Sequence, residues 1–262
     1  MARLRALTGL LVAFAVALPT GVSAQGDAGV APPSIQPAVE PSAETDCDRR
    51  ALVEAAEADW RLREKEWCDP DDLARLIAAV EALDACAADA RPRERWVFPV
   101  ARSQPERSIG GTNGDGYRRA RYLPCYATKY PGHPAHDLFV RDRHPTARDR
   151  EGRPFEALAA EDGVVLVARG GWKEGDQTKG GNYVLLYIPA RKWILYYAHL
   201  ETVAVRPGDR VAAGQVVGLV GRTGKNALPH RSPTHLHFSA WDARTFKPFN
   251  PYKLLVAAET RP

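Results

Sequence analysis

From Tyr183 to His199 the chain reads YVLLYIPARKWILYYAH. Two runs rich in aromatic and aliphatic residues flank the segment Pro189 to Lys192, and such runs on either side of a turn are typical of a β-hairpin. The sequence after Trp96 continues as short runs of this kind separated by Gly and Pro, including Val203 to Val220. It therefore predicts a mostly β domain of antiparallel sheets, in which the hairpin delivers His199 to one end.

Two helical patterns precede this β domain. The first, from about Asp48 to Glu66, is rich in Ala, Glu and Arg. The second begins with Asp69 as N-cap and Pro70 at the first helical position. Its apolar residues recur at helical spacing: Leu73, Leu76, Ile77, Val80 and Leu83. The short connection predicts an N-terminal α-helical hairpin over residues 45–92, which we expect to be a docking or structural appendage and a possible site for a protein partner.

The N-terminus indicates export. Arg3 and Arg5 precede a short apolar run from Leu7 to Leu18, and small residues follow up to Ala24, which is typical of a secretory signal peptide over residues 1–24. The apolar run is shorter than the about 20 residues of a membrane span, so we expect no stable span after cleavage. We therefore expect a periplasmic or secreted protein. Residues 25–44, dominated by Pro, Ala, Ser and Gly, predict a disordered linker.

Four cysteines, Cys47, Cys68, Cys86 and Cys125, favour disulfides in an exported chain. A zinc-thiolate cluster is disfavoured because no C-x-x-C pair is present. An antiparallel helical hairpin would place Cys47 and Cys86 at its open end, where they could pair, and leave Cys68 to pair with Cys125. The sequence does not choose among the three possible pairings.

The formal net charge of the chain is +4. Acidic residues are in excess before Trp96 and basic residues after it, so the C-terminal part would favour an anionic polymer. The basic residues are scattered and are not interleaved with aromatic ones, so we expect no nucleic-acid partner.

Five of the seven histidines and one carboxylate lie in three short stretches: HPAHD (His133 to Asp137), YAH (Tyr197 to His199) and HLH (His235 to His237). This is the inventory of a three-ligand catalytic zinc site with two further histidines. In a strand, His235 and His237 face the same side. Pro134 disfavours a helical conformation at His133, so a loop leading into a strand from Asp137 is expected. These residues alone leave the ligand set open.

Taken in order, these motifs resemble the zinc-dependent peptidoglycan endopeptidases of the lysostaphin and LytM type, peptidase family M23. The resemblance covers about residues 96 to 257 and includes GGNYVLLY, YYAHL, RPGDRVAAGQVVGLVGRTG and THLHF. It implies a peptidase domain over residues 96–257 in which His133, Asp137 and His237 bind Zn²⁺. It implies catalytic roles for His199 and His235.

The chain departs from the usual HxG form of the first motif, because Pro134 and Ala135 follow His133. The next residue, His136, could compete as a ligand. Asn182 and Asn226, beside Gly-rich turns, could bond the substrate backbone or simply form those turns.

The implied function is that of a secreted zinc-dependent endopeptidase which hydrolyses peptide cross-links of bacterial peptidoglycan, with the peptide stems as substrate. No HExxH glutamate is present, so a histidine would act as general base. The alternative is a non-catalytic cell-wall-binding or hydrolase-activating protein of the same fold, and metal storage is a third. All five expected site positions carry the required residues, which favours the enzyme.

Overall fold

The computed structural model describes residues 49–64, 69–84, 91–118 and 132–261. The predicted signal peptide and linker and all four cysteines lie outside these residues, and so do the predicted disulfide pairings. No helix in the described part of the chain is long and apolar enough to cross a membrane.

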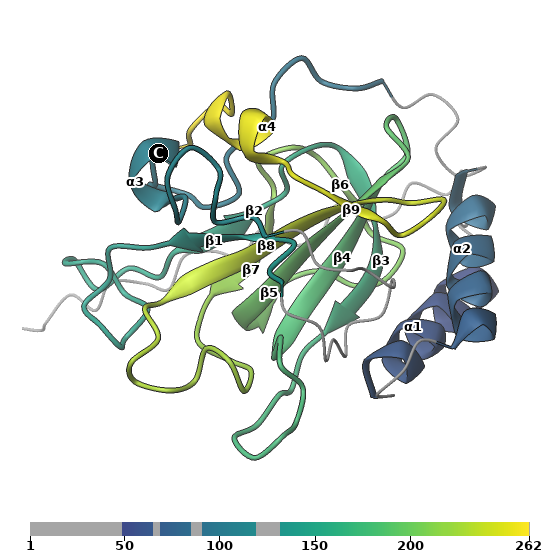
Figure 1. Cartoon of the computed structure of the whole chain (residues 1–262), viewed down its shortest axis with the longest axis horizontal. Coiled ribbons are helices and arrows are strands. Elements are labelled where there is room, and N and C mark those ends of the chain that lie inside the picture. Colours follow the sequence, from purple (N-terminus) through teal and green to yellow (C-terminus); the bar gives the residue numbers. More distant parts are fainter. Residues whose placement is uncertain (1–48, 65–68, 85–90, 119–131, 262) are drawn as a thin grey trace, which may run out of the picture. The chain divides into compact units, whose positions relative to one another are not determined.

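The nine strands of the described chain form one antiparallel sheet (Figure 1). Its strands are β1 (His136–Phe139), β2 (Glu156–Leu158), β3 (Gly163–Arg169), β4 (Asn182–Ile188), β5 (Trp193–Val203), β6 (Arg210–Val211), β7 (Val216–Val220), β8 (His235–Asp242) and β9 (Pro248–Phe249). The main path runs β1-β8-β5-β4-β3-β6; β7 pairs with β2 and β5, and β9 pairs with β8. The mostly β, antiparallel fold class predicted from the sequence is confirmed.

The helices are α1 (Arg49–Glu64), α2 (Pro70–Asp84), α3 (Pro105–Ser108) and α4 (Tyr252–Val256). The first two lie in the part of the chain where the spacing of apolar residues predicts a helical hairpin. In α2, Leu76, Val80 and Leu83 are buried, as their spacing along one helix face requires. Arg61 of α1 donates a hydrogen bond to Asp72 of α2 (2.9 Å), which joins the two helices.

Strand β4 is buried along its whole length because both of its faces are covered. Side chains that alternate along β4, β5 and β8 divide between two apolar clusters. One cluster includes Val184, Leu186, Tyr197 and Phe238. The other includes Tyr183, Leu185, Tyr196 and Trp241 together with apolar side chains of α1 and α2. A strand covered on both faces has no polar alternation, which explains the continuous run YVLLYI.

The contact between α1 and the sheet contains a buried polar pair. Asp59 of α1 and Tyr183 of β4 are both fully buried, and the Tyr183 hydroxyl donates a hydrogen bond of 2.6 Å to Asp59 Oδ2. Beyond the other end of β4, Lys192 forms an ion pair of 2.6 Å with Asp84 of α2. The helical hairpin is therefore tied to the sheet by polar contacts as well as by apolar packing.

Tyr183→Phe should lower the free energy of unfolding by about 1 to 3 kcal/mol, because it removes the phenol that solvates a buried carboxylate oxygen. Urea denaturation followed by circular dichroism measures the change. Tyr252→Phe is the matched control, since the Tyr252 hydroxyl makes no hydrogen bond to any described residue. Equal unfolding midpoints for Tyr183→Phe and the wild type would show that this pair does not hold the helices to the sheet.

Candidate metal and catalytic site

Strands β1 and β8 place three of the predicted site residues on one face. Asp137 is paired with His237, and Phe139 is paired with His235. Directly paired residues point to the same side of a sheet, so Asp137, His235 and His237 share a face. His133 lies in the segment before β1, where its backbone forms two hydrogen bonds of 2.8 Å with Arg118.

Three potential ligand atoms converge at this face. His133 Nε2 lies 3.2 Å from Asp137 Oδ1, His237 Nδ1 lies 3.1 Å from the same oxygen, and the two nitrogens are 3.3 Å apart. Among the described residues, these three form a group that could hold a metal ion. Tetrahedral zinc with bonds of about 2.0 to 2.1 Å separates its ligand atoms by about 3.3 Å. The observed triangle therefore has the size that zinc requires.

The hydrogen bond on the other side of His133 identifies which ring nitrogen is available. Nδ1 lies 3.1 Å from the carbonyl oxygen of Gly116, which can only accept, so Nδ1 carries the proton. The lone pair of Nε2 then faces the Asp137 carboxylate and Nδ1 of His237. Electron-rich atoms at this separation need a proton or a cation between them. The donor set thus fits zinc, and the three side chains are 22 to 27 % exposed, which leaves a further position open to water.

The charge states of Asp137 and His237 support the same assignment. Burial opposes ionisation of Asp137, but its contacts with the His133 and His237 rings outweigh burial and hold the pKa of Asp137 below its ordinary value. Burial also lowers the pKa of His237, which favours its neutral form. An ionised carboxylate and a neutral imidazole are the forms that bind metal.

His199 reaches this face through an irregular backbone. Ala198 is paired with His237, so strict alternation would point His199 to the opposite face. The φ angle of His199 is 64°, in the left-handed region, and the register of β5 shifts against β7 just beyond it. As a result, the His199 ring centroid lies 5.0 Å from that of His235 and 5.7 Å from that of His237.

His199 and His235 are oriented in the same way. Nδ1 of His199 lies 2.8 Å from the Thr223 carbonyl oxygen, and Nδ1 of His235 lies 2.7 Å from that of Pro233. Each Nδ1 therefore carries a proton and donates a hydrogen bond to a carbonyl, and each Nε2 keeps a lone pair. Burial, with His235 and His237 nearby, lowers the pKa of His199 to about 3. His199 is therefore neutral near pH 7, with Nε2 unprotonated.

His136 is not part of this cluster. It precedes Asp137 in β1, so its side chain points to the other face of the sheet. The ring is fully buried between those of Tyr117 and Tyr252, and Nε2 lies 2.8 Å from Asn250 Oδ1. The structure therefore does not support His136 as a competing ligand.

The side chain of Asn182 makes hydrogen bonds within the protein. Its side chain accepts a hydrogen bond from the backbone N–H of Trp172 (2.9 Å) and donates one to the carbonyl of Glu201 (3.0 Å). Asn226 is exposed in the segment after Gly224.

The sequence gave no sign of the roles of Thr223 and Gly116. Their backbone carbonyls orient the rings of His199 and His133. Every residue has a carbonyl, so residue type cannot reveal this role.

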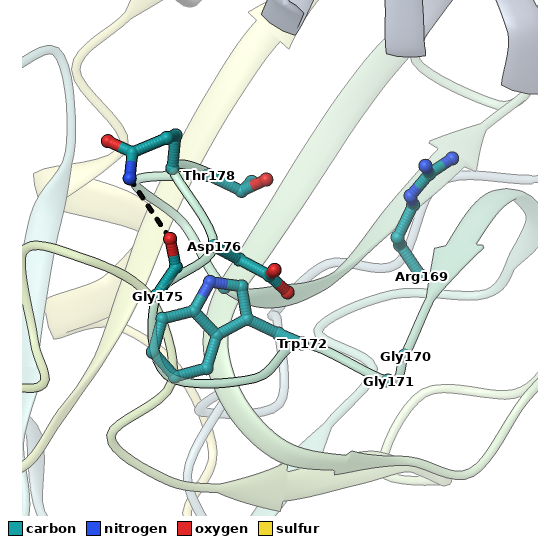
Figure 2. Close-up of a pocket in the computed structure, with 9 residues that line it drawn as sticks. Arg169, Gly170, Gly171, Trp172, Gly175, Asp176 and Thr178 are labelled. Carbon is teal, nitrogen blue, oxygen red and sulfur yellow. Dashed lines mark hydrogen bonds between the residues drawn. The ribbon is translucent and has the colours of Figure 1, made fainter.

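The loop between β3 and β4 adjoins the site, since the Gly180 carbonyl accepts a hydrogen bond from His199 N (2.8 Å). A cavity of about 450 Å³ in this loop is lined by residues 169–172, 175–178 and 181. Figure 2 shows Trp172 and Asp176 in the loop, with the Arg169 side chain extending away from them.

Residues 149–251 match the model of Peptidase family M23. This span contains His199, His235 and His237, and it begins after His133 and Asp137.

Two curated proteins are similar to this chain. "Glycyl-glycine endopeptidase ALE-1" of Staphylococcus capitis is 37% identical over 87 residues, which are 33% of this chain and 21% of that protein. "Peptidoglycan DD-endopeptidase ShyA" of Vibrio cholerae is 35% identical over 69 residues, which are 26% of this chain and 14% of that protein. The chain thus spans about a fifth or less of the length of these relatives. Among solved structures, the catalytic domain of the antimicrobial peptidase lysostaphin from Staphylococcus simulans aligns with a TM-score of 0.40 and 23% identity, covering 58% of this chain and 94% of that one.

Proposed function

We propose, from the peptidase family M23 domain that this chain contains, that the protein is a zinc-dependent endopeptidase which hydrolyses peptide cross-links in bacterial peptidoglycan. One observation carries the proposal: the ligand atoms of His133, Asp137 and His237 approach to 3.1–3.3 Å, beside His199 and His235. Two similar proteins, a glycyl-glycine endopeptidase and a peptidoglycan DD-endopeptidase, support the substrate class.

His133, Asp137 and His237 would hold the zinc ion. Zinc supplies Lewis acidity, which activates water near neutral pH and polarises the carbonyl of a peptide bond. The chain's own contribution to ligand binding is orientation. The Gly116 carbonyl fixes the His133 ring so that Nε2 faces inward, and the Tyr196 ring packs edge-on against His237, with centroids 5.8 Å apart. Supports of this kind keep ligands in place.

His199 and His235 would carry out the proton transfers of the reaction. Each presents Nε2 as an acceptor because Nδ1 is bound to a backbone carbonyl. A neutral imidazole can take a proton from the attacking water and, once charged, pass it to the leaving amine or stabilise the negative oxygen that develops on the carbonyl. We assign this work to the pair, which supplies the general base that the missing HExxH glutamate would otherwise provide.

The proposal includes the location of the protein, which is the periplasm or the extracellular space. The signal-peptide pattern of residues 1–24 supports export to the periplasm or beyond, where cysteines form disulfides. A protein partner at the helical hairpin stays a prediction, and the inner faces of α1 and α2 are already buried against the sheet. The convergence of all five site residues favours the enzyme over the non-catalytic alternative.

The protein lacking residues 1–24 should release uncross-linked peptide fragments from purified peptidoglycan, and EDTA should abolish the release until zinc is restored. Mass spectrometry of the fragments identifies the cleaved bond. Two substrates, one with direct cross-links and one with glycine bridges, separate the two wall chemistries. Binding to both peptidoglycans without any new amino terminus would instead establish the non-catalytic cell-wall-binding alternative.

A further inference from the structure

The backbone at His199 is the irregular feature on which the site depends. A non-glycine residue with φ near 64° is strained, and such a conformation persists only where surrounding contacts fix it. Without it, alternation along β5 would turn the imidazole toward the apolar cluster that contains Tyr197 and Phe238. Whatever holds this backbone therefore decides on which face His199 lies.

The backbone groups of His199 are held from two sides. Its N–H donates to the Gly180 carbonyl (2.8 Å), and its own carbonyl accepts from Gly221 N–H (3.0 Å). These bonds replace regular ladder pairing, because β5 loses register with β4 and with β7 near this point. They fix the backbone of His199 only if the loops that carry Gly180 and Gly221 are themselves fixed.

Thr223 joins those loops to β5. Its hydroxyl donates to the Leu200 carbonyl (2.7 Å) and accepts from Asn182 N–H (2.9 Å), while its own carbonyl accepts from His199 Nδ1 (2.8 Å). The approach is close, since a side chain on Gly181 would clash with the Thr223 backbone and hydroxyl. One residue thus contacts both the backbone after His199 and the His199 ring.

Asn182 adds a second connection. Its buried side chain donates to the carbonyl of Glu201, two residues beyond His199, and accepts from Trp172 N–H. Glu201 is also paired with both terminal nitrogens of Arg148, at 2.6 and 2.7 Å. The segment after His199 is thereby fixed by side chains as well as by backbone bonds.

We propose that Thr223 and Asn182 are positioning residues, which hold the left-handed backbone at His199 and so keep its imidazole on the face of the metal site. The catalytic consequence rests on the proposed peptidase function. No hydrogen bond joins either side chain to His133, Asp137 or His237. Their loss should therefore impair the reaction step and leave metal binding intact.

Thr223→Val and Thr223→Ser separate the hydroxyl from the volume of the side chain. Thr223→Val should lower kcat by about 10- to 100-fold with KM and zinc content unchanged, as expected for a misplaced catalytic group. Thr223→Ser keeps the hydroxyl and should recover most of the rate. Thr245→Val, at an exposed turn beyond β8, is the matched control and should leave kcat unchanged. An equal loss in the Val and Ser variants, or no loss in Val, overturns the proposal.

A second measurement does not depend on hydrolysis. Nitrogen-15 spectra of the imidazole groups should show His199 with its proton on Nδ1 in the wild type and in Thr223→Ser, but a mixture of tautomers in Thr223→Val. If the wild type cleaves no peptidoglycan, the proposed function fails while this spectrum still decides the positioning role. An unchanged His199 spectrum in Thr223→Val overturns that role. If Thr223→Val does not fold, Asn182→Ala, which removes the bond to Glu201, carries the same expectation.

Discussion

Asp137→Ala should lose its bound zinc and almost all cleavage of peptidoglycan. Asp137 Oδ1 lies within 3.5 Å of His133 Nε2, His235 Nε2 and His237 Nδ1, so it contacts three of the four imidazoles of the site. Removing it deletes a ligand and the negative charge that offsets the cation. The fall in kcat/KM should exceed the about 10²- to 10³-fold that removal of a single transition-state donor costs.

Elemental analysis of the purified variant measures zinc directly. His237→Ala removes another ligand and should behave in the same way. Asp209→Ala is the matched control, because that carboxylate accepts a hydrogen bond from Arg206 N–H in a turn. Full zinc content in both Asp137→Ala and His237→Ala would show that the ligand set is wrong.

His199→Ala should keep its zinc and lose cleavage by about 10²- to 10⁴-fold, the range for removal of a general acid or base. No ligand atom of the proposed triad belongs to His199, whose Nδ1 is bound to Thr223. Zinc content and turnover are therefore measured on one preparation of this variant, and we expect the zinc content to be retained while turnover falls.

Two further variants sharpen the test. Because φ at position 199 is positive, alanine there is strained and glycine is not, so His199→Gly should be at least as stable as His199→Ala while equally inactive. His144→Ala, which removes an exposed histidine elsewhere, should retain turnover. Turnover near the wild-type rate in both position-199 variants would exclude His199 from the mechanism.

Local patterns in the sequence predict much of this fold. The hairpin β4–β5 follows from two apolar runs around a turn, and the shared face of His235 and His237 follows from their spacing in a strand. These inferences succeed because they depend on neighbours in the sequence. The ligand set did not follow from spacing; it required the resemblance to a family.

The contacts that complete the site lie between distant segments. Alternation alone places His199 on the wrong face, because the backbone that reverses it depends on Gly180, Gly221 and Thr223. The role of Asn182 stayed open for the same reason, since its partners lie 10 and 19 positions away. Nor could the continuous run in β4 reveal which face the helices cover.

The docking of α1 and α2 limits where the β domain can be cut out of the chain. Residues 149–251 match the family model, yet Tyr183, Tyr187, Tyr196 and Trp241 within that span are buried in a cluster that includes side chains of residues 51–83. A fragment cut at the family boundary would expose this aromatic surface to water and to other copies, which favours aggregation. We therefore expect a transplantable catalytic unit to begin at α1, and a chimaeric wall hydrolase to need both helices.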